Sequence, residues 1–348
     1  MALRMALGSA MRRAIYLGVV YAHSRRVPEP MKLPTVQILL SCRNSQAFLG
    51  DLLGSLERQT FTDWQLLVRD DGSTDGTQGI VKGFEHRSPG RLEWLRDDGG
   101  AAGPCQSFGR LLRASTAPYV MFCDHDDVWL PRKIERTLET MREAEVQATR
   151  EGRPGEAATP ILVFTDLAVV DVHLRPLGPS YWTYHHCDPR RTSLAQLLVQ
   201  NVVTGCTVML NRPLAELAQP IPPQAVMHDG WVALVAACFG TIRLLDEPTV
   251  LYRQHGGNVL GVKPWGLRRI ARRALSSRPA RHDLACDIAQ ARALLEQYAE
   301  RLPPEKKATL AAFASLPDRT FLGKRLTLLR HRLFKSGLLR TLGLLRDV

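Results

Sequence analysis

A short apolar run that stops abruptly at a cluster of carboxylates is the feature that most constrains the fold of this chain. Residues 119–123 read Tyr-Val-Met-Phe-Cys, and Asp124, His125, Asp126 and Asp127 follow directly. A short apolar run bounded by a polar break predicts an interior strand of a parallel sheet. Ligands of open α/β sheets bind at the carboxyl ends of such strands, so these acidic residues are predicted to border a binding site.

The spacing of the carboxylates suggests what they bind. Asp124 and Asp126 stand two residues apart, which turns both side chains to the same side at the end of a strand. Two carboxylates at such a short separation repel each other unless a proton or a cation neutralises them. A hard divalent ion such as Mg²⁺ or Mn²⁺ fits this pair. The alternative is that Asp126 or Asp127 caps the helix expected to begin near Pro131.

Strand and helix patterns alternate through the first half of the chain. Short apolar runs at 36–40, 64–68, 91–95 and 119–123 predict strands, and apolar residues at helical spacing follow them. This alternation predicts an α/β fold with a doubly wound, mostly parallel sheet and right-handed crossovers. The second half is expected to contain strands near 161–164, 202–210, 242–245 and 249–252, a helix at 231–239, and an irregular, substrate-facing loop at 181–186.

Composition and charge divide the chain into three parts. The hydrophobic fraction of 45% and the charged fraction of 23% are those of a globular protein. Seven cysteines without a C-x-x-C pair are interpreted as reduced core residues of a cytoplasmic protein. Residues 262–348 contain 19 Lys and Arg against 7 Asp and Glu. We therefore expect a basic leader at 1–34, a catalytic domain at 35–262 and a basic helical tail at 263–348.

The basic tail has two interpretations. Leucines fall on one predicted helical face, namely Leu322, Leu326, Leu329 and Leu333. A basic amphipathic helix of this kind can lie on an anionic membrane surface, which would place the protein peripherally on the inner face of the cell membrane. Equally, this face can pack on the main domain. No recognised nucleic-acid motif is present, so no nucleic-acid partner is expected, and no apolar run reaches the roughly 18 residues that a membrane span needs.

Further polar groups follow other predicted strands. Asp71 lies in the loop after the second strand, and Asp229 opens the helix near 231–239. Asp71 is either a ligand for a nucleotide or a turn former before glycine, and Asp229 is either a general base or a plain N-cap. His255 follows Arg253 in a Gly-rich segment, which favours a cluster that faces an anion. We expect these loops to converge at one edge of the sheet, where they would form a site for a metal and a polyol or nucleotide.

The order of these motifs resembles glycosyltransferase family 2, which has the GT-A fold. The matching segments are 41–44 (SCRN), 70–75 (DDGSTD), 122–131, 203–207, 227–231 and 252–258. The last two most resemble bacterial rhamnosyltransferases. The sequence departs from the family pattern at His228, where many members have Glu, and at His125, which is often Gln.

The resemblance implies a role for each matching residue. Asp229 would be the base that deprotonates an acceptor hydroxyl, and attack on the anomeric carbon would invert its configuration. Asp126, Asp124 and His255 would hold Mg²⁺ or Mn²⁺. The residues implied to bind the nucleotide sugar are Ser41, Arg43, Asp71, Ser73, Asp124 and Arg253.

The implied donor is dTDP-rhamnose and the implied acceptor a lipid-linked or polysaccharide glycan of the cell surface. Two alternatives stay open, a UDP-hexose glycosyltransferase of the same fold and a non-catalytic nucleotide-sugar-binding scaffold at the membrane. A sugar-phosphate nucleotidyltransferase shares the doubly wound sheet, but it would carry a Gly-rich phosphate loop after the first strand. Residues 41–46 contain no glycine, which disfavours that class.

Overall fold

The computed structural model describes residues 33–97, 100–152, 157–256 and 281–348. Nearly all of the predicted basic leader lies outside these ranges, as do Gly257, Asn258 and the first part of the predicted tail. The domain boundary expected at 262/263 also falls there and stays a prediction.

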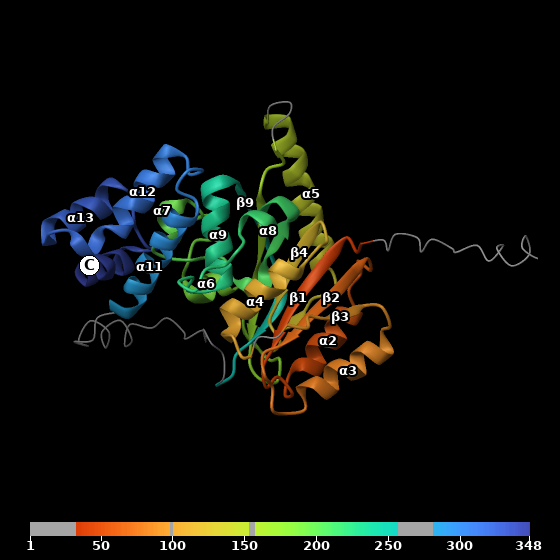
Figure 1. Cartoon of the computed structure of the whole chain (residues 1–348). Helices are drawn as coiled ribbons and strands as arrows, with labels where there is room; N and C mark the ends of the chain where they lie inside the picture. The colour runs from red at the N-terminus through yellow and green to blue at the C-terminus, as the bar shows by residue number, and fades with distance from the viewer. Residues whose placement is uncertain (1–32, 98–99, 153–156, 257–280) are drawn as a thin grey trace, which may run out of the picture. The chain divides into compact units, whose positions relative to one another are not determined.

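A nine-stranded sheet forms the centre of the described chain (Figure 1), in the order β3-β2-β1-β4-β8-β6-β9-β5, with β7 pairing on β6. The strands are β1 (Val36–Cys42), β2 (Trp64–Asp70), β3 (Leu92–Trp94), β4 (Tyr119–Cys123), β5 (Val128–Trp129), β6 (Ile161–Val170), β7 (Pro176–Gly178), β8 (Met209–Asn211) and β9 (Thr241–Arg253). Pairing is parallel from β3 to β4, and β8 pairs antiparallel with both β4 and β6. The predicted α/β class with a mostly parallel sheet is confirmed.

Alternating side chains of the parallel strands enter two separate cores. Leu39 and Phe122 point to one face, where they pack with helices that include α4 (Gly103–Ala114) and α9 (His228–Phe239). Leu40 and Cys123, one residue further along each strand, point to the other face. Both faces of the sheet are therefore buried, which is why these strands are almost continuously apolar.

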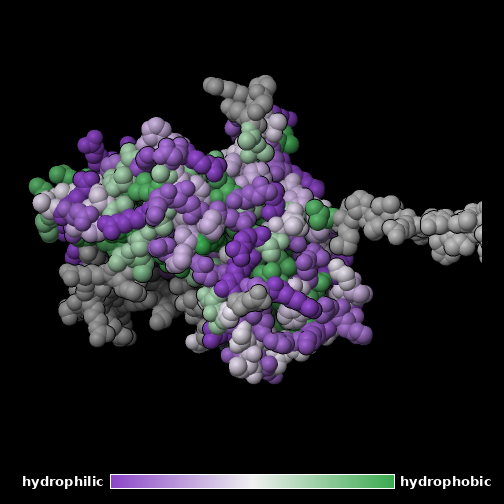
Figure 2. Space-filling model, in the orientation of Figure 1, coloured by the Kyte–Doolittle hydropathy of each residue, from purple (hydrophilic) through white to green (hydrophobic). Residues whose placement is uncertain are grey.

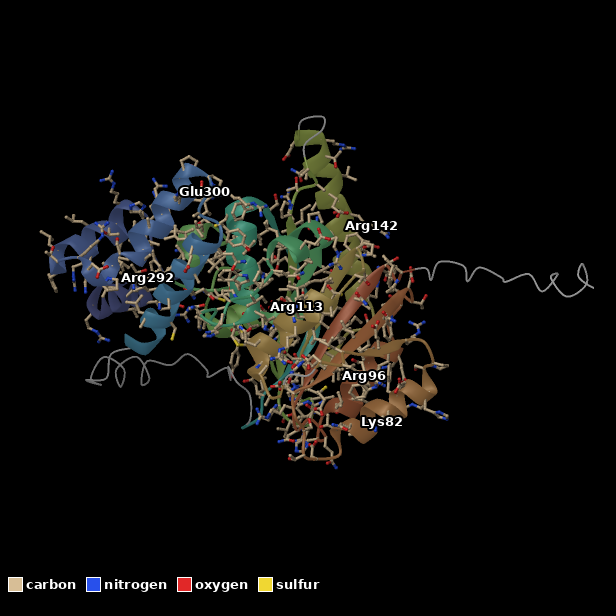
Figure 3. The ribbon with its side chains drawn as sticks, viewed as in Figure 1. Lys82, Arg96, Arg113, Arg142, Arg292 and Glu300 are labelled. Atoms are coloured by element: carbon tan, nitrogen blue, oxygen red, sulfur yellow. The ribbon has the colours of Figure 1, made fainter. Side chains whose placement is uncertain are left out.

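Most of the helices that cover the sheet are amphipathic, whereas α9 is buried on nearly all sides. Besides α4 and α9 they are α2 (Leu49–Glu57), α3 (Thr77–Arg87), α5 (Lys133–Glu151), α6 (Tyr181–His185), α7 (Leu194–Leu197) and α8 (Arg212–Leu217). Figure 3 labels charged side chains on three of them, Lys82 on α3, Arg113 on α4 and Arg142 on α5, and all three are exposed. The opposite sides of the same helices supply buried residues such as Val81 and Met141.

Four more helices form the C-terminal region, α11 (Arg281–Gln297), α12 (Pro304–Ala314), α13 (Phe321–Arg330) and α14 (Leu338–Asp347). The first of them docks on the segment before α9, where Val226 donates its backbone N–H to Gln290 Oε1 at 2.9 Å. Tyr298 donates its hydroxyl to the carbonyl of Leu217 at 2.6 Å. The predicted helical C-terminal appendage is present. No described helix combines the length and the apolar composition needed to cross a membrane.

The second half of the chain differs from the sequence predictions in three places. Residues 181–185 form the helix α6, with Trp182 buried, where we expected an irregular loop. The strands expected at 242–245 and 249–252 form one strand, β9, whose pairing with β6 shifts register on the way. Within 202–210 a 3₁₀ turn at Gly205–Thr207 precedes a strand of three residues. Short elements such as these give weak periodic signals.

Candidate functional site

The carboxyl ends of three parallel strands meet at one edge of the sheet. Leu40 of β1 is paired with Cys123 of β4, and Cys42 of β1 is paired with Asp70 of β2. The residues that follow these pairs, including Ser41, Asp71 and Asp124, therefore lie along one rim. This is the edge at which open α/β sheets bind ligands.

Asp71 connects β2 to the start of α4. Its carboxylate accepts backbone N–H groups of Ala102 at 2.7 Å and Gly103 at 2.9 Å, and it pairs with Arg69. Burial alone would raise the pKa of Asp71, but these bonds outweigh it and hold the pKa below its usual value. Arg69 also pairs with Asp97 at 2.9 Å. Asp71 thus anchors the rim from within, and its contact with a nucleotide stays a prediction.

The two loops after β1 and β2 hold each other through Ser73. Its hydroxyl contacts Asp70 Oδ1 at 2.5 Å and accepts the backbone N–H of Asn44 at 3.0 Å. Ser41 donates to the Ser107 hydroxyl of α4 at 2.7 Å, and the side chain of Arg43 is exposed. The predicted donor-binding residues are therefore gathered on one rim, with Arg43 open to solvent.

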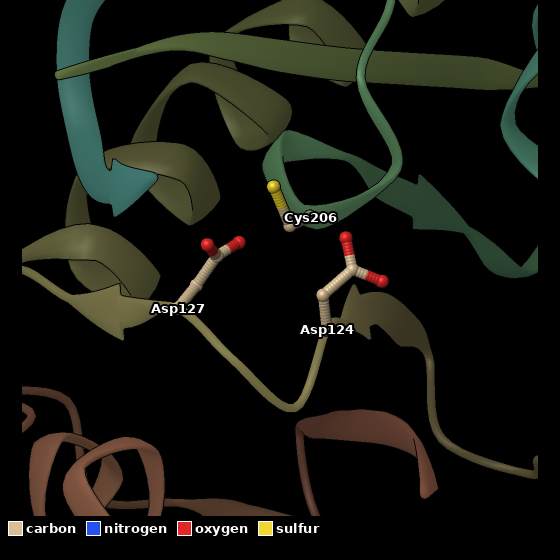
Figure 4. A group of neighbouring side chains, drawn as sticks. All are labelled: Asp124, Asp127 and Cys206. Carbon is tan, nitrogen blue, oxygen red and sulfur yellow. The ribbon is translucent and has the colours of Figure 1, made fainter. Parts of the chain in front are cut away.

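The acidic loop after β4 holds several carboxylates close together. Figure 4 shows Asp124, Asp127 and Cys206 pointing into the same space, and their ligand atoms lie within 4.8 Å of one another. Burial and the negative charges of Asp126 and Asp229 raise the pKa of Asp124 to about 7. Burial together with Asp126 and Asp124 raises the pKa of Asp127 as well. This loop therefore carries more negative charge than its surroundings easily accommodate.

Asp126 and His255 fit a divalent cation. His255 Nε2 lies 2.8 Å from Asp126 Oδ2. Adjacent ligands of an octahedral Mg²⁺ at about 2.1 Å are about 3 Å apart, so this separation suits two ligands of one ion. Asp124, in the same loop, is a second oxygen donor. Cys206 suits such an ion poorly, because hard cations prefer oxygen and burial keeps the thiol protonated by raising its pKa.

Arg253, which we expected to bind the nucleotide sugar, points inward. Its side chain is only 3% exposed and pairs with Asp51 at 2.8 Å, and its contact with the donor stays a prediction. The guanidinium also donates to the carbonyls of Asp126 at 2.9 Å and Val172 at 2.7 Å, and its backbone N–H bonds Asp127 Oδ1 at 3.1 Å. These contacts make Arg253 a positioning residue that fixes the acidic loop from behind.

Asp229 lies in the first turn of α9 and faces the same rim. Its carboxylate accepts the backbone N–H groups of Gly205 at 3.0 Å and Gly230 at 2.6 Å. Burial raises its pKa to about 6, although these two bonds lower it. Gly205, which bonds Asp229, is followed by Cys206, whose sulfur lies within 4.8 Å of an Asp124 carboxylate oxygen, so Asp229 and Asp124 lie on either side of this turn. A carboxylate with such a pKa is suited to general base catalysis near neutral pH.

The residue before Asp229 is packed between aromatic rings. The His228 ring stacks on Phe108 at 4.0 Å and meets the edge of Phe122 at 4.6 Å between centroids. Burial lowers its pKa to about 3, so the imidazole is neutral. A Cβ at Gly205 would lie 2.8 Å from His228 Nε2, so only glycine fits there. His228 and Gly205 together set the position of Asp229.

Sequence reasoning missed three residues that support the site, namely Arg69, Lys133 and Cys206. All three are buried, and only Arg69, a charged residue within the apolar second strand, carried a signal in the sequence. Lys133 is fully buried beside the Trp129 ring at 4.7 Å and contacts Thr249 at 3.3 Å. Burial lowers its pKa to about 8.

The family model described as "Glycosyl transferase family 2" matches residues 37–214, just over half of the chain. The chain belongs to glycosyltransferase family 2. The predicted family is thereby confirmed, and the match covers the rim from β1 through the segment that contains Cys206.

Curated relatives of this family member have different stated substrates. The dTDP-rhamnosyl transferase RfbG of Shigella flexneri is 27% identical over 63% of this chain and 72% of the relative. The UDP-Glc:alpha-D-GlcNAc-diphosphoundecaprenol beta-1,3-glucosyltransferase WfgD of Escherichia coli is 31% identical over 30% of this chain and 40% of the relative. The chain spans from two-fifths to about two-thirds of the length of the first three curated relatives.

A solved structure supports the fold assignment. S. aureus TarS 1–349 in complex with UDP-GlcNAc has a TM-score of 0.55 with this chain at 15% identity, over 81% of this chain and 70% of TarS. At this identity the similarity establishes the GT-A-like architecture of the family member.

Replacing Arg69 by leucine is expected to destabilise the protein strongly. The substitution leaves Asp71 buried without its ion-pair partner, and such a loss costs about 3–5 kcal/mol. Chemical denaturation of the variant measures this directly. Arg87→Leu is the control, because Arg87 is exposed in its ion pair with Glu57 and should change the free energy of unfolding by less than about 1 kcal/mol. An Arg69 variant as stable as the control would contradict this anchoring role.

Replacing Gly205 by alanine is expected to displace Asp229 without unfolding the protein. The new Cβ would collide with a His228 ring that its aromatic neighbours hold in place, and overpacking costs about 1–3 kcal/mol. A misplacement of about 1 Å can lower turnover by about 100-fold. Turnover with a cognate donor and circular dichroism test this. Gly79→Ala, where a Cβ meets nothing within 4 Å, should retain wild-type turnover, and equal turnover of both variants would refute the steric argument.

Proposed function

We propose that this family member is an inverting glycosyltransferase of cell-surface glycan synthesis, which moves a sugar from a nucleotide-sugar donor to a glycan acceptor. The observation that carries the proposal is the juxtaposition of Asp229 and Asp124 across the rim. An activated donor held at Asp124 and Asp126 would have its anomeric carbon near the one carboxylate that is suited to act as base. A scaffold without turnover would not require a base in this position.

Asp229 is the proposed catalytic residue. It accepts the proton of an acceptor hydroxyl while that oxygen attacks the anomeric carbon, and the nucleoside diphosphate leaves from the opposite face. The bond from the acceptor oxygen forms on one face of the anomeric carbon while the bond to the leaving diphosphate breaks on the other face, so the configuration inverts. The N–H groups of Gly205 and Gly230 hold the carboxylate in place, and burial keeps its pKa near 6, so it is ionised at neutral pH yet basic enough to take a proton.

Asp126, Asp124 and His255 are the proposed ligands of a divalent cation, Mg²⁺ or Mn²⁺. When bound, such an ion offsets the negative charge that develops on the leaving diphosphate. Arg253 keeps these ligands in place by binding the Asp126 carbonyl from behind. Ser41, Arg43, Asp71 and Ser73 are the proposed contacts to the nucleotide sugar along the rim.

The proposed donor is dTDP-rhamnose. Its support is the likeness of residues 227–231 and 252–258 to rhamnosyltransferases, together with the similarity to RfbG. The similarity to WfgD, whose name states a UDP-glucose donor, favours a UDP-hexose as the second candidate. WfgD is also named for a diphosphoundecaprenol acceptor, which supports a lipid-linked acceptor. A cytoplasmic protein at the inner face of the membrane would meet such a lipid.

Replacing Asp229 by asparagine is expected to lower kcat by about 10²–10⁴-fold, because positioned general bases contribute that much. The wild-type kcat/KM for the acceptor should fall about tenfold per pH unit below about 6, since the base form of Asp229 is lost as the pH drops through its pKa. The variant should lose this limb of the profile. Rates with saturating Mn²⁺ between pH 5 and 8 provide the test.

Asp246→Asn is the matched control for this experiment. Asp246 is exposed on β9, so the same chemical change there should leave both kcat and the pH profile as in the wild type. Wild-type transfer by Asp229→Asn would show that another group is the base.

Donor and metal are expected to stabilise the protein together. A ligand at 100 times its Kd adds about 2.7 kcal/mol to the free energy of unfolding. A panel of dTDP-rhamnose, UDP-glucose and UDP-GlcNAc, with Mn²⁺ or with a chelator, can be read as Tm shifts. We expect dTDP-rhamnose with Mn²⁺ to give the largest shift, and Asp126→Asn to abolish the part that depends on Mn²⁺. A larger shift with UDP-glucose would favour the second donor, and shifts unaffected by chelation would refute the metal ligands.

A further inference from the structure

The last two helices expose large apolar side chains more densely than any other part of the described chain. Of its twelve exposed large apolar residues, seven lie within residues 321–342. These are Phe321, Leu322, Leu326, Leu329, Leu338, Leu339 and Leu342, which are between 50% and 75% exposed. Contiguous apolar surface on a protein marks a contact with another molecule or with a membrane.

The exposed residues of α13 form a stripe along one side of the helix. At 3.6 residues per turn, Leu322, Leu326 and Leu329 fall within a narrow sector, and Arg325 and Arg330 flank it. The opposite side is buried through Leu328. Figure 2 shows hydrophobic surface over α13 next to hydrophilic surface. The sequence prediction was wrong in one respect, because Leu333, assigned to the same face, is fully buried.

Helix α14 repeats this arrangement. Leu338, Leu339 and Leu342 are exposed, and Arg346 is exposed in the same sector of the helix. Leu344, on the other side, is buried. Each helix therefore buries one side against the protein and presents leucine and arginine on the other.

Contacts with the rest of the protein hold these helices in place. Arg191 donates to the Phe334 carbonyl at 2.5 Å, and Gln200 accepts the backbone N–H of Ser336 at 2.7 Å. Arg340 donates to the His186 carbonyl at 2.9 Å. These contacts fix the inner sides of the C-terminal helices on the rest of the protein. The leucines on the outer sides are exposed to solvent.

The charge around the exposed leucines identifies that partner. Residues 319–348 contain eight Lys and Arg and one acidic residue, Asp347. A second copy of this surface would bring like charges together, which opposes self-association. An anionic bilayer complements the charge and accepts the leucines at its interface. We infer that the exposed sides of α13 and α14 dock this protein on the surface of an anionic phospholipid bilayer.

This inference goes beyond the proposed transfer reaction and does not depend on it. Membrane docking uses no residue of the rim, so loss of turnover in Asp229→Asn and loss of docking are separate outcomes. If the acceptor is lipid-linked, docking would keep the enzyme on the surface that contains its substrate.

Flotation of the full chain on vesicles tests the inference. Vesicles of equal parts phosphatidylglycerol and phosphatidylcholine are compared with vesicles of phosphatidylcholine alone. We expect flotation on the anionic vesicles, and a decrease of about tenfold or more in the partition coefficient for Leu322→Gln/Leu326→Gln. Arg325→Gln/Arg330→Gln should also bind more weakly and respond less to a rise in ionic strength from about 0.05 to about 0.5 M.

A matched pair of substitutions provides the control. Val146→Gln/Leu177→Gln removes two other exposed apolar side chains, 52% and 48% exposed, and should float as the wild type does. Circular dichroism verifies folding, and Leu338→Gln/Leu342→Gln on α14 serves as the second test pair. Wild-type flotation by both leucine variants would overturn the inference. It would also be overturned if the wild type did not float and sedimented as a dimer, while the leucine variants sedimented as monomers. The surface would then join two copies of the protein.

Discussion

Mutual repulsion among carboxylates at one edge of the sheet is the constraint on which the rest of this structure depends. Asp71, Asp124, Asp126, Asp127 and Asp229 all lie along or beneath this rim, and burial strengthens their repulsion. Opposing charges and N–H groups are accordingly placed around them. Arg69 and the start of α4 stabilise Asp71, and Arg253 supports the loop of Asp126 and Asp127. This compensation is incomplete, because burial and the charges of Asp126 and Asp229 still raise the pKa of Asp124 to about 7.

The two halves of the sheet contribute differently to this arrangement. The parallel half, from β3 to β4, brings three strand ends to one rim and so gathers the loops that are predicted to bind the donor. Antiparallel β8 then inserts beside β4, and the turn before it places Gly205 and Cys206 against the acidic loop. Because Gly205 bonds Asp229, this insertion also positions α9. A fully parallel sheet would supply the rim without placing Asp229 opposite it.

Much of the fold and of the candidate site could be predicted from the sequence, because the strongest sequence signals were local. The apolar run before Asp124 marked a strand end, and the apolar run after Asp229 placed that residue at the start of a helix. The sequence could not predict that Arg253 turns inward, since its partners Asp51, Asp126 and Val172 are distant along the chain. Cys206 was missed for the same reason, since its neighbours Asp124 and Asp127 are distant along the chain. For Leu333 the helical period was right, but the turn after α13 takes that residue out of the helix.

Because Arg253 points inward, the acidic loop depends on a contact that forms late in the synthesis and folding of the chain. This residue is the last of β9, yet it bonds partners that precede it by 127 residues at Asp126 and by 202 at Asp51. The acidic loop therefore lacks its rear support until β9 has been synthesised and paired. A nascent chain that ended within β8 would hold every residue of the predicted donor cluster except Arg253, but it would still lack His255 and the support that Arg253 gives to the Asp126 carbonyl. Competence to bind the donor is consequently expected to arise in a single late event of folding, after most of the sheet is complete.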